Sequence, residues 1–91
     1  SHMATDAAFR EVADKVKAWK PAKPTSNDQK LRLYALFKQA DKGDVTESRP
    51  SFFSPTDRAK WDAWKALEGK SVDDARAEYI EEAQLQMREH S

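Results

Sequence analysis

Residues 31 to 45, LRLYALFKQADKGDV, contain the pattern that decides how the chain folds. Tyr34 and Lys38 are four residues apart, so on a helix they lie within about 40° of each other. They share an edge beside the apolar positions. Four residues form this apolar stripe at helical spacing: Leu33, Leu36, Phe37 and Ala40. The stretch therefore predicts a helix that packs on one side and presents a hydroxyl and an ammonium group beside its core.

Two interpretations of this edge follow from the residues alone. In one, Tyr34 is half-buried and Lys38 is solvated. In the other, a phosphate group accepts hydrogen bonds from the Tyr34 hydroxyl and the Lys38 ammonium, while the Phe37 ring stacks on an adenine. Spacing alone favours the first interpretation.

Helical patterns also precede and follow this stretch. A helix is expected over residues 5–19, and the segment KPAKPTS ends it because proline disfavours helix at the preceding residue. Ser26 and Gln29 form a capping box that begins the next helix. Gly43 then provides a left-handed cap at the end of that helix.

The second half of the chain predicts two more helices. Ser54 and Pro55 begin one of them as N-cap and first helical residue, and Ser71 caps the other. The connection over residues 44–53 is long for a four-helix bundle, which indicates that the second and third helices run parallel. Its two adjacent phenylalanines predict that it packs across the helices. The sequence thus predicts an all-α, four-helix fold.

Composition limits the function classes. The 91 residues suit a single domain over residues 4–91, and residues 1–3 are interpreted as a cloning scar. The 16 basic and 16 acidic residues balance, which argues against nucleic-acid binding. Residues 15–38 nevertheless carry a charge of +6, whereas residues 71–91 carry −4. A basic side of this kind suits a small anionic ligand. No apolar run approaches the ~18 residues of a membrane span, so a cytoplasmic protein is expected.

Catalytic and metal-binding patterns are not found in the sequence. The chain has no cysteine, and its two histidines lie in the scar and at the C-terminus. The commonest general bases and nucleophiles are therefore missing, and no zinc or calcium spacing occurs. We expect neither an enzyme nor a cofactor.

Aromatic residues on the other predicted helices have two interpretations each. The segment AKWDAW places Lys60 and Trp64 four residues apart, and taken alone its tryptophans are expected to pack in the core. Tyr79 lies between two alanines one turn away on either side, which leaves room for a ligand or for a neighbouring helix. Phe9 is expected in the core.

The order of LYALFKQADKGDV, RP, AKWDAW and GKSVDDARAEYI closely resembles the acyl-CoA-binding protein family. The resemblance extends over essentially the whole chain after the scar. It implies an up-down-down-up four-helix bundle that binds fatty acyl-CoA esters without transforming them. A cytoplasmic monomer is implied, with no nucleic acid partner and at most transient contacts with membranes or acyl-CoA-using enzymes.

The family motifs also imply roles for particular residues. Tyr34 and Lys38 would contact the 3′-phosphate of the nucleotide, and Lys60 would add charge from the third helix. Tyr79 and Lys17 would approach the same end of the ligand. The complete expected site for acyl-CoA comprises Lys17, Tyr34, Ala35, Leu36, Phe37, Lys38, Lys60 and Tyr79, with Leu31 and Phe9 at the groove for the acyl chain.

Two positions depart from the family pattern. Phe37 stands where family members commonly have a second tyrosine, so a hydroxyl is missing, although stacking on adenine is retained. Thr56 stands where a lysine is common. Two other function classes stay open: a helical module whose aromatic edge docks a partner helix, and a nucleotide or membrane-surface binder that uses the basic side.

Overall fold

The computed structural model describes residues 5–91, so the expected scar at residues 1–3 lies outside the described part. Within these residues the chain forms helices and contains no strand. The four helices are α1 (Asp6–Ala18), α2 (Asn27–Lys42), α3 (Pro55–Lys65) and α4 (Val72–Glu89). The predicted all-α, four-helix fold is confirmed.

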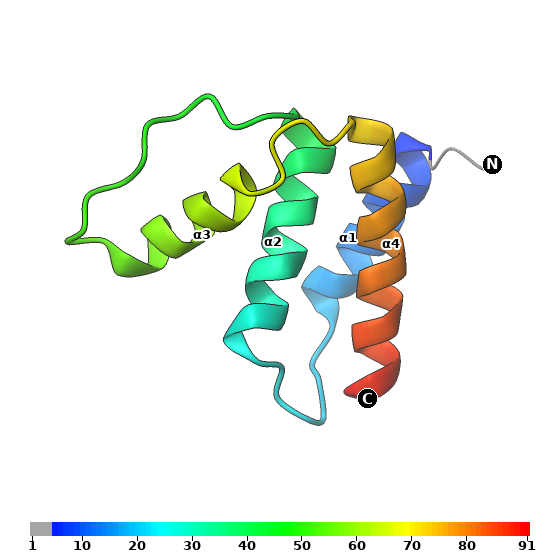
Figure 1. Ribbon diagram of the computed structural model, residues 1–91. Helices are drawn as coiled ribbons and strands as arrows, with labels where there is room; N and C mark the ends of the chain where they lie inside the picture. Colours follow the sequence, from blue (N-terminus) through cyan, green and yellow to red (C-terminus); the bar gives the residue numbers. More distant parts are fainter. Residues whose placement is uncertain (1–4) are drawn as a thin grey trace.

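The helices have the up-down-down-up order (Figure 1). α2 packs against α4 on one side and α3 on the other, while α1 packs against α4. α1 and α4 run toward one end of the molecule and α2 and α3 toward the opposite end, as the long connection between α2 and α3 predicted. α3 is strongly tilted and leans away from the other three helices (Figure 1).

Side-chain caps fix the start of three helices. Ser26 and Gln29 form the predicted capping box on α2, with bonds of 2.8 and 3.1 Å. Ser71 accepts from the Asp74 backbone N–H at 3.1 Å, as expected for α4. At α1, Thr5 accepts from the Ala8 N–H at 3.0 Å. These contacts span three residues, so local sequence is enough to specify them.

Two predicted caps differ in detail. Ser54 is the N-cap of α3, but its side chain makes no capping bond because its ψ of 69° is not the extended conformation that such a bond needs. Its backbone N–H instead donates to the Ser51 carbonyl at 2.9 Å. Gly43 has the expected positive φ of 79°, but its ψ of −149° lies outside the left-handed helical region. The chain therefore leaves α2 in an extended direction toward the long connection.

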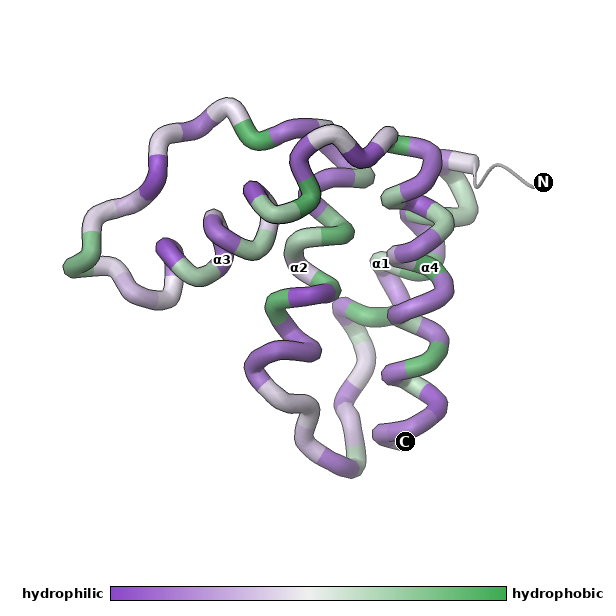
Figure 2. Tube along the Cα trace, in the orientation of Figure 1, coloured by the Kyte–Doolittle hydropathy of each residue, from purple (hydrophilic) through white to green (hydrophobic). Residues whose placement is uncertain are grey.

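The core lies between α1, α2 and α4. Figure 2 shows hydrophobic positions recurring along α2 and α4 between hydrophilic ones. Alanines at the helix contacts let the backbones approach closely and leave the volume to larger side chains. The buried cluster consists of Phe9, Val12, Leu36, Ala40, Ala75, Tyr79 and Ala83.

Buried glutamines, which the sequence patterns did not predict, connect helices through polar bonds. Gln86 on α4 donates to the Gln29 carbonyl on α2 at 3.2 Å and to Glu82 at 3.0 Å. Gln39 at the end of α2 donates to Asp44 at 2.9 Å and to the Lys70 carbonyl at 2.8 Å. Both side chains are buried, and their amide N–H groups find acceptors on neighbouring segments, whereas their Oε1 atoms have no partner among the described residues.

The connection between α2 and α3 differs from the prediction. Phe52 and Phe53 do not pack across the helices; their residues are 68% and 81% exposed. Trp61 and Arg49 hold the connection instead. The Trp61 indole N–H donates to the Glu47 carbonyl at 2.8 Å, and Arg49 makes a bidentate pair with Asp62 at 2.9 and 2.8 Å. The predicted packing of the phenylalanines is therefore wrong. The hydrogen bonds of Trp61 and Arg49 attach the connection to α3, and the two phenylalanine side chains remain exposed.

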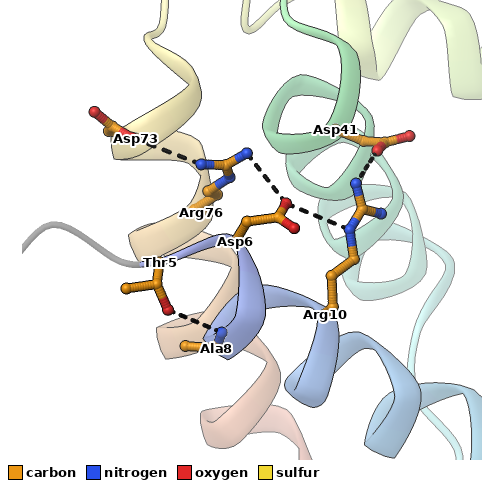
Figure 3. A network of polar contacts seen from close by, with 7 residues as sticks. All are labelled: Thr5, Asp6, Ala8, Arg10, Asp41, Asp73 and Arg76. Carbon is orange, nitrogen blue, oxygen red and sulfur yellow. Dashed lines mark hydrogen bonds and ion pairs between the residues drawn. The ribbon is translucent and has the colours of Figure 1, made fainter.

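An ion-pair network joins the start of α1 to its neighbours (Figure 3). Arg10 pairs with Asp41 of α2 and lies 3.5 Å from Asp6. Arg76 of α4 reaches the same Asp6 at 3.2 Å and Asp73 at 3.8 Å. Asp6 and Arg10 are largely exposed, whereas the side chains of Arg76 and Asp41 are half-buried. Ion pairs with an exposed partner contribute little stability, so the network chiefly orients the three helices.

Asp44 joins the end of α2 to the turn before α4. Its carboxylate accepts from the Gly69 backbone N–H at 2.9 Å and from the Gln39 side chain. These two hydrogen bonds, that of Gly69 first, lower the pKa of Asp44 below its ordinary value of 3.8. The ionised carboxylate therefore contributes stability above pH 3.8 that is lost as pH falls through the lower pKa of the folded state.

We expect Asp44→Ala to lower the free energy of unfolding at neutral pH, and the difference from the parent chain to narrow at acidic pH. Urea unfolding followed by circular dichroism at a series of pH values measures this difference. Asp14→Ala, at an exposed position of α1, is the matched control. A difference that stays constant into the acid range would contradict the role given to the Asp44 carboxylate.

Candidate functional site

The edge of α2 faces α3 and brings three of the predicted residues together. The Lys60 ammonium of α3 lies 5.4 Å from the centroid of the Tyr34 ring. On α2, the Lys38 ammonium lies 6.0 Å from that centroid and 5.2 Å from the Trp64 ring of α3. Two positive charges from different helices therefore gather around one tyrosine, held by cation–π contacts.

A hollow of about 260 Å³ lies at this point. Tyr34 and Lys60 line it together with Trp61, Trp64 and Pro50 of the connection, whereas Lys38 lies beside Tyr34 but does not line the hollow. Lys38 and Lys60 have no ion-pair partner among residues 5–91. Their charge is thus available to an anionic ligand.

Two carboxylates that sequence patterns did not indicate also line this hollow. Glu47 belongs to the connection and Asp57 to the first turn of α3. Burial first, and then the charges of these two acids, raise the pKa of the Tyr34 hydroxyl. A tyrosine hydroxyl is protonated at neutral pH even at its ordinary pKa of 10, and the raised pKa extends the range over which it is a hydrogen-bond donor.

The two tryptophans of α3 form the wall of the hollow. Trp64 is only 2% exposed, and its indole N–H donates to the Gly43 carbonyl at 2.9 Å. Trp61 is half-buried and holds the Glu47 carbonyl. Arg49 lowers the pKa of Asp62 through their hydrogen bonds, so this pair stays ionised beside the wall. Core packing, expected for both tryptophans, is complete for Trp64 and partial for Trp61.

Apolar hollows continue along the interface of α2 and α3. One of about 350 Å³ is lined by Leu31, Pro55, Thr56 and Lys60, among others. Another, of about 320 Å³, is lined by Leu31 as well. Lys60 borders both the first of these and the hollow at Tyr34, so the three spaces follow one another from the charged end to the apolar end. We call this series the α2–α3 groove.

Ala35 and Leu36 lie beneath the groove. They are 3% and 1% exposed and help to line the hollow beyond Leu31. Their hydrocarbon side chains form an apolar floor for the groove and cannot make hydrogen bonds to a ligand. Their predicted place in the site thus corresponds to the floor of the apolar end.

Phe9, Phe37 and Tyr79 lie elsewhere, in one aromatic cluster. Their ring centroids are 5.3 to 5.9 Å apart, and Phe9 is 0% exposed. Phe9 is therefore a core residue, and in this structure it presents no surface at a groove rim. Burial raises the pKa of the Tyr79 hydroxyl to about 12. Lys17 is exposed on α1 and lines none of the hollows of the α2–α3 groove.

The described residues give two further findings. No helix within residues 5–91 has both the length and the apolar character needed to cross a membrane. The same part of the chain holds no group of three or more potential metal-ligating side chains.

The fold is a small helical bundle, and the groove between α2 and α3 consists of hollows that can accept a small-molecule ligand. The family described as Acyl CoA binding protein matches residues 6–83. The chain belongs to this family.

Relatives and solved structures agree with this membership. The chain is 57% identical over 72 residues to the acyl-CoA-binding domain-containing protein 3 of Oryza sativa subsp. japonica. This match covers 79% of the chain but only 45% of the rice protein, so the chain spans less than half of that relative. It is also 57% identical over 72 residues to the acyl-CoA-binding protein of Brassica napus, covering 79% of the chain and 76% of the relative.

The crystal structure of Oryza sativa acyl-CoA-binding protein 2 has a TM-score of 0.81 and 48% identity, covering 89% of this chain and 88% of that one. The solution structure of the yeast acyl coenzyme A binding protein has a TM-score of 0.74 and 39% identity, covering 96% and 99% of the two chains. These similarities support the four-helix arrangement of the whole described chain.

Proposed function

We propose that the chain binds and carries medium- or long-chain fatty acyl-CoA esters in the α2–α3 groove, without transforming them. One observation carries the proposal: Lys38 and Lys60, from two helices, meet at the Tyr34 ring at the charged end of a groove whose other end is apolar. An acyl-CoA ester has the same polarity, with phosphates at one end and a hydrocarbon chain at the other. The relatives named above are acyl-CoA-binding proteins, which supports the same ligand for this chain.

The headgroup would be held by charge and by one hydroxyl. The ammonium groups of Lys38 and Lys60 would donate charge-assisted hydrogen bonds to the 3′-phosphate. The Tyr34 hydroxyl, which is protonated at neutral pH, would donate a third. Glu47 and Asp57 line the same hollow as Tyr34 and Lys60, so their charges would oppose the phosphate there and the lysines would have to outweigh them.

The departures from the family pattern have local consequences. Thr56 lines the apolar hollow near Leu31 and supplies no charge there. Phe37 is half-buried against Tyr79, so only its exposed side would stack on the adenine. Tyr79 would support this ring from below. Lys17 would contribute a long-range positive charge only.

The rest of the proposal concerns the molecule as a whole. The chain would act as a cytoplasmic monomer that needs no cofactor and has no nucleic acid partner. Contacts with membranes or with enzymes that use acyl-CoA would be transient.

Affinity is expected to rise with the length of the acyl chain. Each methylene that enters the apolar part of the groove contributes ~0.8 kcal/mol, or about fourfold in affinity, until the groove is full. Isothermal titration calorimetry over a series of saturated acyl-CoA esters measures this slope, with free CoA as the reference. An affinity that does not change with chain length would place the acyl chain outside the groove.

A further inference from the structure

A pair of exposed aromatic rings lies at the end of the connection before α3. The ring centroids of Phe52 and Phe53 are 4.2 Å apart, with an interplanar angle of 32°. Among the described residues only Leu85, at 38%, is another large hydrophobic residue that is exposed. The connection bends at the hydrophobic segment just before α3, at the edge of the molecule farthest from α4 (Figures 1 and 2). No other part of the described chain covers these rings.

The backbone around the pair is fixed rather than free. Ser51 accepts the Phe53 N–H on its side chain at 3.2 Å and the Ser54 N–H on its carbonyl at 2.9 Å. Pro50 and Pro55 flank the segment, and the Arg49–Asp62 pair anchors it to α3. The rings are therefore presented in one arrangement, which reduces the entropy lost when they bind a partner.

We propose that Phe52 and Phe53 insert into the surface of a lipid bilayer. The pair forms an exposed tip at the bend of the connection, and each phenylalanine can bury only about 150–250 Å². Two such side chains fall well short of the roughly 800 Å² per partner that a stable protein interface needs. A bilayer surface, by contrast, can accept a small apolar wedge supported by nearby positive charge.

Charge around the tip suits an anionic lipid surface. Residues 49–62 contain three basic and two acidic residues, a local charge of +1, and Arg49 is already paired with Asp62. Arg58 and Lys60 have no ion-pair partner among residues 5–91. The Nε of Arg58 is buried, and Lys60 is also the residue proposed for the phosphate of acyl-CoA, so in the ligand-free chain their positive charge acts on lipid headgroups as a modest local attraction. The aromatic tip and the basic residues thus combine the two attractions that hold a peripheral protein on a membrane.

The tip is also adjacent to the α2–α3 groove. Pro55 and Thr56, which follow the pair directly, line the hollow that contains Leu31. Insertion of the rings would bring this mouth of the groove to the membrane surface, where amphiphiles with a hydrocarbon chain accumulate. Bilayer binding by the rings does not itself depend on the proposed function.

Co-sedimentation with phosphatidylcholine vesicles that contain phosphatidylserine tests the inference. We expect the parent chain to partition onto these vesicles, and the double substitution Phe52→Ser with Phe53→Ser to reduce the partition coefficient roughly tenfold or more. Leu85→Ser is the matched control, because Leu85 is exposed on α4, and should leave partitioning unchanged. Thermal unfolding by circular dichroism should be the same for all variants, since the replaced side chains are exposed.

Several results would overturn the inference. One is equal partitioning of the double variant and the parent chain onto the vesicles. If salt also abolishes the binding of both, the attraction is electrostatic and the rings do not contribute. Another is self-association of the parent chain that the double variant loses, measured by sedimentation velocity without vesicle binding. Titration with acyl-CoA separates the two proposals. If the double variant loses vesicle binding but still binds acyl-CoA, the role of the tip is supported. If the parent chain binds vesicles but not acyl-CoA, only the proposed function is refuted.

Discussion

Trp64→Ala is expected to destabilise the fold by about 3–5 kcal/mol, as for other buried aromatic side chains cut back to alanine. Trp64 is 2% exposed and is the residue of α3 that packs fully against the rest of the molecule. The substitution would leave a cavity between α2 and α3 and would remove the hydrogen bond to the Gly43 carbonyl. It would also remove the ring that supports Lys38.

Urea unfolding followed by far-ultraviolet circular dichroism measures this loss, and two variants divide it into parts. Trp64→Phe keeps most of the packing but loses the indole donor, so we expect a cost of roughly 1 kcal/mol for the hydrogen bond together with a small packing loss. Trp61→Ala, at a half-buried position one turn earlier, should cost less than Trp64→Ala. A loss below about 1 kcal/mol for Trp64→Ala would mean that α3 is not anchored through this residue.

The parts of the fold that the sequence predicted depend on short-range contacts. The capping box of Ser26 and Gln29 and the cap of Ser71 join residues three apart, so their residue types specify them. The apolar stripe around Leu36 is similarly local, since helical geometry fixes its face.

The parts that it did not predict depend on residues distant in the chain. Gln39 is buried because it meets the Lys70 carbonyl, 31 residues away. Phe52 and Phe53 are exposed because Trp61 and Arg49, rather than the phenylalanines, hold the connection against α3. Residue types in the connection gave no indication of which side chains would make these contacts.

The candidate site was predictable to a similar extent. The shared edge of Tyr34 and Lys38 followed from helical geometry, whereas the approach of Lys60 depends on the tilt of α3 and was expected only through the family resemblance. Glu47 and Asp57 were missed because one lies in an irregular segment and the other resembled an ordinary helix N-terminal acid. Phe9 was expected both in the core and at the groove rim, and the structure places it in the core.

Lys38→Ala and Lys60→Ala are each expected to weaken acyl-CoA binding by roughly 1.5–3 kcal/mol, which is typical of a hydrogen bond to a charged group. Both ammonium groups are half-buried beside Tyr34 and have no ion-pair partner among residues 5–91 to compete with a phosphate. Isothermal titration calorimetry with one acyl-CoA ester measures the losses. Lys42→Ala provides the control, because Lys42 is an exposed lysine one turn from Lys38 on the same helix and, unlike Lys38, makes no cation–π contact with Tyr34 or Trp64.

An acyl-CoA analogue without the 3′-phosphate identifies the group that the two lysines bind. If both lysines act on that phosphate, the parent chain loses affinity for the analogue, and Lys38→Ala or Lys60→Ala then costs little more. The two changes are therefore non-additive, as expected for groups in direct contact. Equal losses with both ligands would show that the lysines act on another part of the headgroup or through the general field of the basic side. Normal binding by both variants would show that the headgroup does not bind beside Tyr34. Among residues 5–91, Lys38 and Lys60 are the cations that contact this ring.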